Sequence, residues 1–530
     1  MQRQQRVGLF LGLEGQRVWH RWLARELERL GHRFSLYRAG RDTAGLPAAL
    51  RLALWLDPIW YRMKGEHAFD PLPKAELRER SADTAADEPL DLLIDLCPGP
   101  ASRPPARRTM TLTFNGMPSE LGAVSALLDG GGLRIEAVGD PDGWHEIARP
   151  AIVLRTCLTD CLDSVFSSVV ELLVERIDRP GWAIAGRPPV PDGRESESPP
   201  SHPSVSIGSI RHVSGLISTK LARYLTARSK DPRRWAIATR RKDERSLIDT
   251  WPSVTSFTVV PDDGQRYYAD PFLFGIGADT FVFCEEYPFA TGRGLISAAR
   301  VGPDGQVGDF RPVLECPYHL SYPFLFTFGG QTWMIPESCD RGTVELYRAV
   351  EFPYRWELDR ILLDDIRGCD ATIIPFGNRY WMTLSTTRWL GATTDKQRLF
   401  HADSPLGPWT EHAMGLIRID STIARPAGAP FQRSGKLLRP AQDCSVRYGG
   451  SMKLLEIEAL SPSSYRETPV ATVSVKMPAE LVGTHTYSAF RELEAVDVWG
   501  QVTGMRSVQL TCAPVEAQLP VATEVPIRSS

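Results

Sequence analysis

The sequence predicts an α/β domain at the amino end, followed by an all-β five-bladed propeller. The second half carries a self-match at a spacing of 52 residues, which aligns Asp270–Phe274 with Tyr322–Phe326 and Glu285 with Glu337. A weaker third copy begins at Asp370. Repeats of roughly 40 to 50 residues, built from short apolar strands and Gly-containing turns, are typical of propeller blades. The first half instead alternates apolar strands with helical periodicity.

The repeat and the strand pattern around it define the expected blades. Five blades are expected, and the first four cover residues 266–301, 318–350, 368–412 and 424–460. The fifth combines residues 468–512 with a strand near 254–260, so that it joins the two ends of the propeller. Such closure would hide the strand edges that an open ring leaves unpaired. The propeller as a whole is expected over residues 235–515, before a tail at 516–530.

The α/β domain is expected over residues 1–178, with a mostly parallel sheet. Strands are expected at 7–11, 34–37, 90–96 and 110–114, and helices at 16–30 and 157–176. The first strand-to-helix turn, from Gly12 to Gly15, lacks the third glycine of a dinucleotide-binding fingerprint. We therefore interpret it as an ordinary turn.

Residues 179–234 are interpreted as the connection between the two domains. The stretch 186–204 is rich in Gly, Pro, Ser and acidic residues and has almost no large apolar side chains, as in a linker. Basic residues cluster after it: Lys220, Arg223, Arg228, Lys230, Arg233, Arg234, Arg240, Arg241 and Lys242. They are expected either to coat a solvated helix or to contact the phosphates of a lipid-linked or nucleotide-linked substrate.

Composition narrows the function classes. A net charge of -3, with 42% hydrophobic and 24% charged residues, gives no overall field that would attract nucleic acid. The nine cysteines form no repeated CxxC pair, which indicates a reducing compartment and no structural zinc. The apolar run from Val7 ends at Glu14, too early for a secretory or spanning segment. We expect a cytoplasmic protein with no nucleic-acid partner, metal or cofactor, while a peripheral contact with a membrane or a glycan-assembly complex stays open.

Equivalent repeat positions should converge, because the innermost strand of each blade faces the propeller axis. Chemistry at an acetal centre needs one carboxylate as base or nucleophile and one carboxylic acid to protonate the leaving oxygen. A third carboxylate raises the pKa of the acid by repulsion. Asp270, Glu337 and Asp370 are therefore the predicted catalytic residues. The competing interpretations are a turn cap for Asp270, which precedes Pro271, and a solvated strand end for Glu337.

Further polar side chains on the repeat, and in the fourth and fifth blades, are predicted to bind substrate: Glu285, Glu286, His319, Tyr322, Arg425, Arg439, Gln442, Asp443 and His485. A rigid Pro follows both Arg425 and Arg439, which suits guanidinium donors that hold hydroxyl or anionic groups. Salt bridges between blades are the alternative role for them. Trp333, Trp381 and Trp389 either stack on a sugar or pack in the core.

Several motifs resemble a known family of propellers: Tyr268–Phe272, Tyr318–Phe324, Ile335–Ser338, Cys369–Thr372, Ala402–Trp409 and Arg439–Asp443. Over about residues 250–515 they resemble the five-bladed propeller of family 43 glycoside hydrolases. They are more similar to the amino-terminal propeller of plant glucosamine inositolphosphorylceramide transferases and its bacterial relatives.

The resemblance implies an axial carboxylate site for glycosides, with Asp270 as the base, Asp370 as the pKa-modulating residue and Glu337 as a candidate acid. In the glycosidases the acid follows the modulating residue in sequence, whereas Glu337 precedes Asp370. The glycosyltransferase domain of the plant enzymes has no counterpart in this sequence.

The amino-end domain weakly resembles formyltransferases. Asn115 matches their catalytic Asn, but Met117 stands where a His is expected. Formyl transfer is therefore not predicted.

Three hypotheses follow. In the first, the chain is a carbohydrate-active enzyme that acts at a glycosidic bond in surface glycan or glycolipid metabolism, by hydrolysis or transfer. In the second, the propeller binds a glycan without catalysis and the α/β domain binds a partner. In the third, the α/β domain is the enzyme, which would require an intact site near Asn115.

Overall fold

The computed structural model describes residues 4–515, apart from 13–14, 40–45, 74–75, 78, 82–88, 98–100, 131, 141–144, 152–156, 179–201, 226–232, 243–245, 250, 303 and 388–392. The expected tail at 516–530 and nearly all of the expected linker at 186–204 lie outside the described residues.

A seven-stranded sheet forms the first part of the chain, in the order β3-β2-β1-β4-β5-β6-β7. The strands are β1 (Arg6–Leu11), β2 (Arg33–Arg38), β3 (Glu79–Ser81), β4 (Leu92–Leu96), β5 (Thr109–Phe114), β6 (Ile135–Asp140) and β7 (His145–Ala148). The first five in the sheet order are parallel, and β6 and β7 are antiparallel. The four strands expected from the sequence correspond to β1, β2, β4 and β5.

Five helices accompany this sheet: α1 (Val18–Arg29), α2 (Ala48–Tyr61), α3 (Glu120–Leu128), α4 (Leu158–Asp178) and α5 (His202–Leu225). Side chains alternate between the two faces of a strand, and β1 follows this rule. Val7 and Leu9 share a core with Trp19 of α1 and Phe166 of α4, whereas Phe10 packs in a separate cluster. The sequence did not predict α2 or α3.

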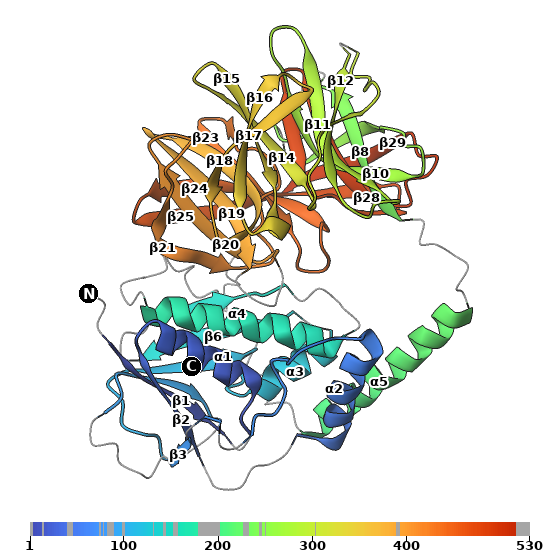
Figure 1. Ribbon diagram of the computed structural model, residues 1–530. Helices are drawn as coiled ribbons and strands as arrows, with labels where there is room; N and C mark the ends of the chain where they lie inside the picture. Colours follow the sequence, from blue (N-terminus) through green and yellow to red (C-terminus); the bar gives the residue numbers. More distant parts are fainter. Residues whose placement is uncertain are drawn as a thin grey trace, which may run out of the picture.

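Antiparallel sheets form the second part of the chain (Figure 1). Three of them have four strands each: β10 (Arg266–Phe274), β11 (Thr280–Pro288), β12 (Leu295–Val301) and β13 (Arg311–Leu314); β14 (Ser321–Phe328), β15 (Gln331–Glu337), β16 (Val344–Glu351) and β17 (Arg355–Leu363); β18 (Arg367–Phe376), β19 (Arg379–Thr387), β20 (Lys396–Ala402) and β21 (Thr410–Ile419). The short 3-10 helix η1 (Cys339–Arg341) follows β15.

The remaining strands form one ten-stranded sheet: β8 (Arg234–Arg241), β9 (Ser253–Val259), β22 (Phe431–Arg433), β23 (Lys436–Asp443), β24 (Ser451–Ser461), β25 (Ser464–Met477), β26 (Leu481–Gly483), β27 (Tyr487–Phe490), β28 (Leu493–Gly500) and β29 (Ser507–Pro514). In it, β9 pairs with β29 and β8 pairs with β28. These pairings join the two ends of the region, as the expected ring closure requires.

The 52-residue repeat has a backbone counterpart. Asp270, Tyr322 and Asp370 have φ angles of 49°, 42° and 55°, in the left-handed region that non-glycine residues seldom occupy. Each lies at a break in the strand register, between Ala269 and Phe272, between Ser321 and Phe324, and between Cys369 and Thr372. Bulges of this kind re-aim a side chain out of the regular alternation. The same local distortion therefore occurs at the same repeat position in β10, β14 and β18.

Helix α4 lies between the two parts of the molecule (Figure 1). The Arg398 guanidinium of β20 donates to Glu171 and Glu175 of α4 at 2.9 and 2.7 Å, and to Glu411 of β21 at 2.7 Å. Two anchored carboxylates on one helix thus hold the third four-stranded sheet against the first part of the chain.

The basic stretch after the linker is divided between two elements. Lys220 and Arg223 belong to α5, whereas Arg240 and Arg241 belong to β8. Arg234 pairs with Asp262, and Arg240 pairs with Glu494 at 3.4 Å. The expectation of one basic helix is therefore wrong for its last residues. Among the described helices, none is long and apolar enough to cross a membrane.

Candidate functional site

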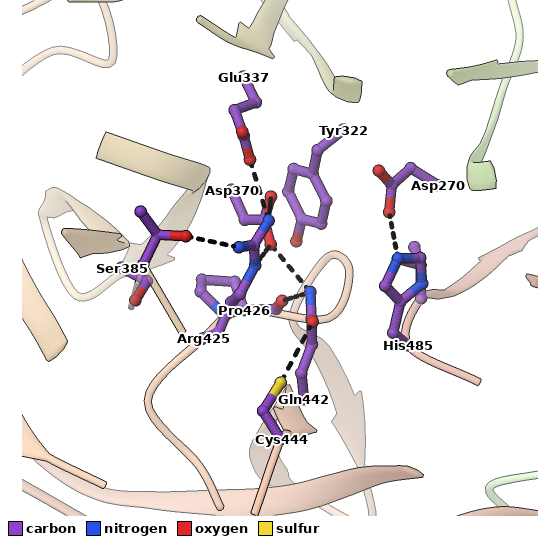
Figure 2. Close-up of polar contacts among 12 residues, drawn as sticks. Asp270, Tyr322, Glu337, Asp370, Ser385, Arg425, Pro426, Gln442, Cys444 and His485 are labelled. Atoms are coloured by element: carbon purple, nitrogen blue, oxygen red, sulfur yellow. Dashed lines mark hydrogen bonds and ion pairs between the residues drawn. The ribbon is translucent and has the colours of Figure 1, made fainter. Parts of the chain in front are cut away.

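A buried guanidinium links two of the three predicted catalytic carboxyls (Figure 2). Arg425 donates to both oxygens of Asp370, at 2.6 and 3.2 Å, and to Oε2 of Glu337 at 3.1 Å. Gln442 donates to Asp370 Oδ2 at 2.9 Å and to the Pro426 carbonyl at 3.0 Å. Asp370 is 1% exposed. Such a geometry holds Asp370 as a paired anion.

The surroundings of Glu337 favour its neutral form. Burial raises the pKa of Glu337 well above its usual range, and the Asp370 charge and a hydrogen bond with Asp370 add to the rise, against the opposing effect of Arg425. Its side chain keeps 12% exposure, so it lies at the edge of the cluster. A carboxylic acid that stays protonated near neutral pH can donate a proton.

Asp270 belongs to a second network. It accepts a hydrogen bond from Thr486 at 2.7 Å and lies 3.7 Å from Nε2 of His485, while its backbone N–H donates to Asp497 at 3.1 Å. Burial raises the pKa of Asp270 to about 7, helped by Asp370 and Asp497 and opposed by His485. A carboxyl with this pKa exchanges protons at neutral pH.

His485 is a fully enclosed cation. Its Nδ1 lies 2.5 Å from Asp497 Oδ2, and its ring stacks on Trp235 with centroids 3.9 Å apart. Burial opposes the charge, but Asp497 and Asp270 together raise the pKa of His485 to about 9. One ligand atom each of Asp270, His485 and Asp497 lie within 4.8 Å of one another, a spacing that could hold a metal ion. At neutral pH, however, the imidazolium has no lone pair for a metal.

Tyr322 separates the two networks (Figure 2). Its hydroxyl lies 2.9 Å from Thr372 Oγ1 and accepts a hydrogen bond from the Gly428 N–H at 2.7 Å. The ring is fully buried and packs edge-on against Phe272. Burial and the Asp370 charge hold the pKa of Tyr322 well above its usual range, so the hydroxyl stays neutral. It therefore positions the blades around the site and has no surface for a sugar.

Glu285 and His319 form a partly exposed ion pair near the Asp270 network. The His319 Nε2 lies 3.3 Å from Glu285 Oε1, and the imidazole is 30% exposed. Although burial opposes it, the hydrogen bond and charge of Glu285 raise the pKa of His319. The charge of Glu285 also contributes to the raised pKa of Asp270, so the pair lies within electrostatic reach of the central carboxyls.

Three residues predicted to bind substrate have structural partners. Glu286 pairs with Arg266 and accepts from Ser297 at 2.6 Å. Arg439 is fully buried and donates twice to Glu467, at 2.9 and 2.6 Å, in an ion pair between β23 and β25. Asp443 caps a turn at Ser445 and pairs with Lys453 at 3.2 Å. These carboxylates and this guanidinium therefore have partners outside the two networks, and their role in substrate binding stays a prediction.

The predicted aromatic platforms are also core residues. Trp333 and Trp381 pack in two hydrophobic clusters with 5% and 2% exposure, and Trp389 lies outside the described residues. Tyr448, which the sequence did not suggest, is 37% exposed. Its ring centroid lies 5.2 Å from the Arg425 guanidinium and 5.2 Å from the His485 ring. It is thus a partly exposed aromatic residue that contacts one member of each network.

In the first part of the chain, Asn115 serves a turn. Its side chain donates to the Gly132 carbonyl at 3.1 Å and accepts from the Arg134 N–H at 2.7 Å, with φ of 50°. Both polar ends of the amide are therefore used to hold a loop.

Comparison with known proteins identifies the region that carries these networks. Residues 248–498 match a family model described as "Glucosamine inositolphosphorylceramide transferase 1, N-terminal". This match confirms the resemblance that the sequence motifs indicated. The glucosamine inositolphosphorylceramide transferase 1 of Oryza sativa subsp. japonica is 36% identical over 210 residues, which are 39% of this chain and 28% of that protein. The Arabidopsis thaliana protein of the same name is 34% identical over 232 residues, 43% of this chain and 30% of its own length.

The match therefore spans less than a third of these plant proteins. Among solved structures, a family 117 glycoside hydrolase from Zobellia galactanivorans is 10% identical, with a TM-score of 0.33 over 50% of this chain and 91% of its own. An exo-1,5-α-L-arabinanase from a bovine ruminal metagenomic library is 13% identical, with a TM-score of 0.32 over 45% of this chain and 94% of its own.

Proposed function

We propose that this chain is a carbohydrate-active enzyme that acts at a glycosidic bond of a glycan or glycolipid, with its chemistry at Glu337, Asp370 and Asp270. The observation that carries the proposal is that Glu337 and Asp370 share the Arg425 guanidinium, while burial and the neighbouring Asp370 raise the pKa of Glu337. Enzymes that cleave acetals need such a separation of two carboxyls into an acid and an anion.

Each carboxyl has a role in this proposal. Glu337 protonates the leaving oxygen, because its side chain keeps 12% exposure at the edge of the cluster and its surroundings raise its pKa, which favours the neutral acid. Asp370 touches Arg425 and Gln442 and acts through its charge on Glu337. Asp270 accepts a proton from the attacking group, since its pKa of about 7 lies near the working pH.

The substrate class follows from the relatives. The plant proteins that this chain resembles are named glucosamine inositolphosphorylceramide transferase 1. We propose a glycan or a glycolipid as the ligand of the present site, bound beneath Tyr448 with its hydroxyls toward His319 and Glu285. In the same proposal the sheets from β8 to β29 form a five-bladed propeller, and the first part of the chain is an α/β domain.

A second function has its own support. The two side chains of the later blades that contact Asp370 are Arg425 and Gln442, and neither releases a proton at neutral pH. A carboxylate that is locked in an ion pair can serve a binding site as well as a catalytic one. The alternative is therefore a glycan-binding module without turnover, with the first part of the chain bound to a partner protein.

A glycan array separates the two. The full chain and its Glu337→Gln variant are applied to the array, and the glycans that bind are then incubated in solution and analysed by mass spectrometry. The enzyme proposal predicts products with the wild type, and binding without products with Glu337→Gln. Glycans that bind both proteins and return unchanged from both would establish the binding module instead.

A further inference from the structure

Two thiols beside the candidate carboxyls take no part in the proposed chemistry. Cys369 directly precedes Asp370 in β18, and Cys339 lies in η1, two residues after Glu337. The two sulfur atoms and a Glu337 carboxyl oxygen all lie within 4.8 Å of one another. Cys369 is 2% exposed and Cys339 is 7% exposed, so Cys339 is the more accessible of the two.

The surroundings make these thiols unequal. A hydrogen bond from Cys369, the charges of Arg367 and Arg425 and a hydrogen bond from Arg367 lower the pKa of Cys339 to about 7, although burial opposes this. The hydrogen bond to Cys339 and burial hold the pKa of Cys369 well above its usual range. Cys339 is therefore the more readily ionised of two thiols that lie close together, which is the arrangement of a nucleophile and a resolving cysteine.

The same charges disfavour a metal ion. A divalent cation that bridged Glu337, Cys339 and Cys369 would lie beside Arg425, which donates to Glu337 at 3.1 Å, and beside Arg367. Two fixed cations repel a third, whereas they stabilise the anionic sulfur. The cluster is therefore better suited to reaction with an electrophile than to coordination.

We propose that Cys339 and Cys369 are an oxidative modification site, in which hydrogen peroxide converts the pair to a disulfide between η1 and β18. The Cys339 sulfur attacks the peroxide, so that an S–O bond forms, the O–O bond breaks and the hydroxide leaves as water with a proton from solvent. Cys369 then attacks the Cys339 sulfenic acid, an S–S bond forms, and the oxygen leaves as water with the Cys369 proton. Two thiols are oxidised by two electrons and one peroxide is reduced to water.

The consequence for turnover rests on the proposed function. A disulfide draws the two sulfurs to about 2 Å, from a separation of up to 4.8 Å. The backbone segments that move carry Glu337 and Asp370, and a misplacement of about 1 Å costs a catalytic site roughly 100-fold in rate. Oxidation is expected to lower turnover by about that factor, and dithiothreitol is expected to restore it.

The test treats the full chain with hydrogen peroxide and maps the products by peptide mass spectrometry. A Cys339–Cys369 crosslink is expected in the wild type. In Cys369→Ser, a sulfenic acid trapped by dimedone is expected on Cys339, and no crosslink at all is expected in Cys339→Ser. Cys512→Ser is the matched control, because burial raises the pKa of that β29 thiol to about 12. Its crosslink yield should equal that of the wild type.

Two results would overturn the modification site. The first is that Cys339 of the wild type is oxidised by hydrogen peroxide but no Cys339–Cys369 crosslink forms. The second is that Cys512 is oxidised in preference to Cys339. If the crosslink forms and turnover is unchanged, the predicted effect on the carboxyls is wrong while the modification stands. The crosslink is measured without substrate, so its failure is distinct from failure of the proposed function.

A separate observation concerns the outer face of α2. Leu52, Trp55 and Ile59 are 48%, 63% and 58% exposed, and their spacing places them on one side of the helix. The opposite side is fixed, because the buried Asp57 accepts a hydrogen bond from the Thr159 N–H of α4 at 3.1 Å. The exposed side chains, named here the α2 face, therefore stay directed outward.

Basic residues flank the α2 face: Arg51, Arg62 and Lys64 are exposed. We infer that the α2 face docks on the surface of a bilayer that contains anionic lipids. Aromatic and aliphatic side chains with basic neighbours are the composition of helices that lie in the lipid interface. This inference does not depend on the proposed chemistry.

Vesicle flotation tests it. The full chain is expected to float with vesicles of phosphatidylglycerol and phosphatidylcholine, and about tenfold less with phosphatidylcholine alone. Trp55→Ser with Ile59→Ser should weaken the first binding by about tenfold or more. Leu358→Ser with Ile361→Ser is the control, because those side chains are 51% and 46% exposed on β17. The inference would be overturned if both double variants floated equally. It would also be overturned if light scattering showed that the wild type is a dimer and that only the α2 double variant is a monomer.

Discussion

Replacement of Asp370 by Asn gives the most informative perturbation of the site. Asp370 receives two hydrogen bonds from Arg425 and one from Gln442, and it is 1% exposed. Removal of one partner of a buried ion pair costs up to about 3–5 kcal/mol, and the loss here is smaller than that limit because Arg425 keeps Glu337 as a second carboxyl partner. For a domain of this size, that loss lowers the thermal midpoint by on the order of 10 °C. Asp370→Asn is therefore expected to be folded at 20 °C but clearly less stable.

Activity should fall for a separate reason. Without the Asp370 charge, Arg425 faces Glu337 alone, and the repulsion that helps to raise the pKa of Glu337 is gone. Glu337 is then expected to ionise and to lose the proton that it would donate. Turnover should drop by about 100-fold or more at neutral pH, since general acid catalysis contributes roughly that much.

Glu467→Gln is the matched control. Glu467 accepts two hydrogen bonds from Arg439 and is enclosed to a similar degree, but it lies in the ion pair between β23 and β25. Its loss of stability should be at least as large as that of Asp370→Asn, because Glu467 pairs with both Arg439 and Arg418, whereas Arg425 keeps Glu337 as a partner. Turnover and calorimetry are measured at a temperature where both variants are folded. Full turnover in Asp370→Asn, or an equal loss of turnover in folded Glu467→Gln, would refute the reasoning.

Three further predictions follow from the same geometry. In the wild type, the raised pKa of Asp270 means that the unfolded chain loses this proton first, so the contribution of Asp270 to stability should fall by roughly 4 kcal/mol between about pH 4 and pH 7. Asp270→Asn removes that component, and urea titrations across this range should give a flatter profile; an unchanged slope would contradict the assignment. His485→Gln removes a cation that lowers the pKa of Asp270, so the acid limb of the pH–rate profile should move to higher pH, and a shift to lower pH would count against it. Tyr448→Ala should weaken glycan binding by about tenfold in calorimetric titrations and leave kcat nearly unchanged, whereas unaltered affinity would exclude Tyr448 as a contact.

The sequence repeat predicted the central positions of the site because repeated segments adopt the same backbone conformation. Asp270, Tyr322 and Asp370 share a repeat position, and all three adopt the left-handed conformation at a break in strand register. Their chemistry is different, since the Tyr322 hydroxyl meets the Thr372 hydroxyl and the Gly428 N–H, whereas Asp370 and Asp270 have the charged partners Arg425 and His485. A self-match therefore locates equivalent places in a fold, and only the partner side chains decide what happens there.

The last two expected blades, at residues 424–460 and 468–512, were harder to predict, because no clear sequence repeat aligns them with the first three. Arg425 and Arg439 both precede a Pro, yet one joins the carboxyl cluster and the other pairs with Glu467. Spacing alone cannot distinguish them, because the partner acid of each is remote in sequence. Asp497 was missed, although an acidic residue inside the apolar strand β28 was a usable signal, since buried carboxylates require partners.

The most direct test of the central claim is a time course of the anomeric proton signals in NMR, for a glycan that binds the full chain, with the wild type and with Glu337→Gln. The account predicts that the substrate signal decays and a product signal rises with the wild type. With Glu337→Gln the glycan should bind with similar affinity, and its conversion should be slower by about 100-fold or more, because a buried Gln keeps the shape of Glu337 without its proton. Equal conversion by both proteins would contradict the account.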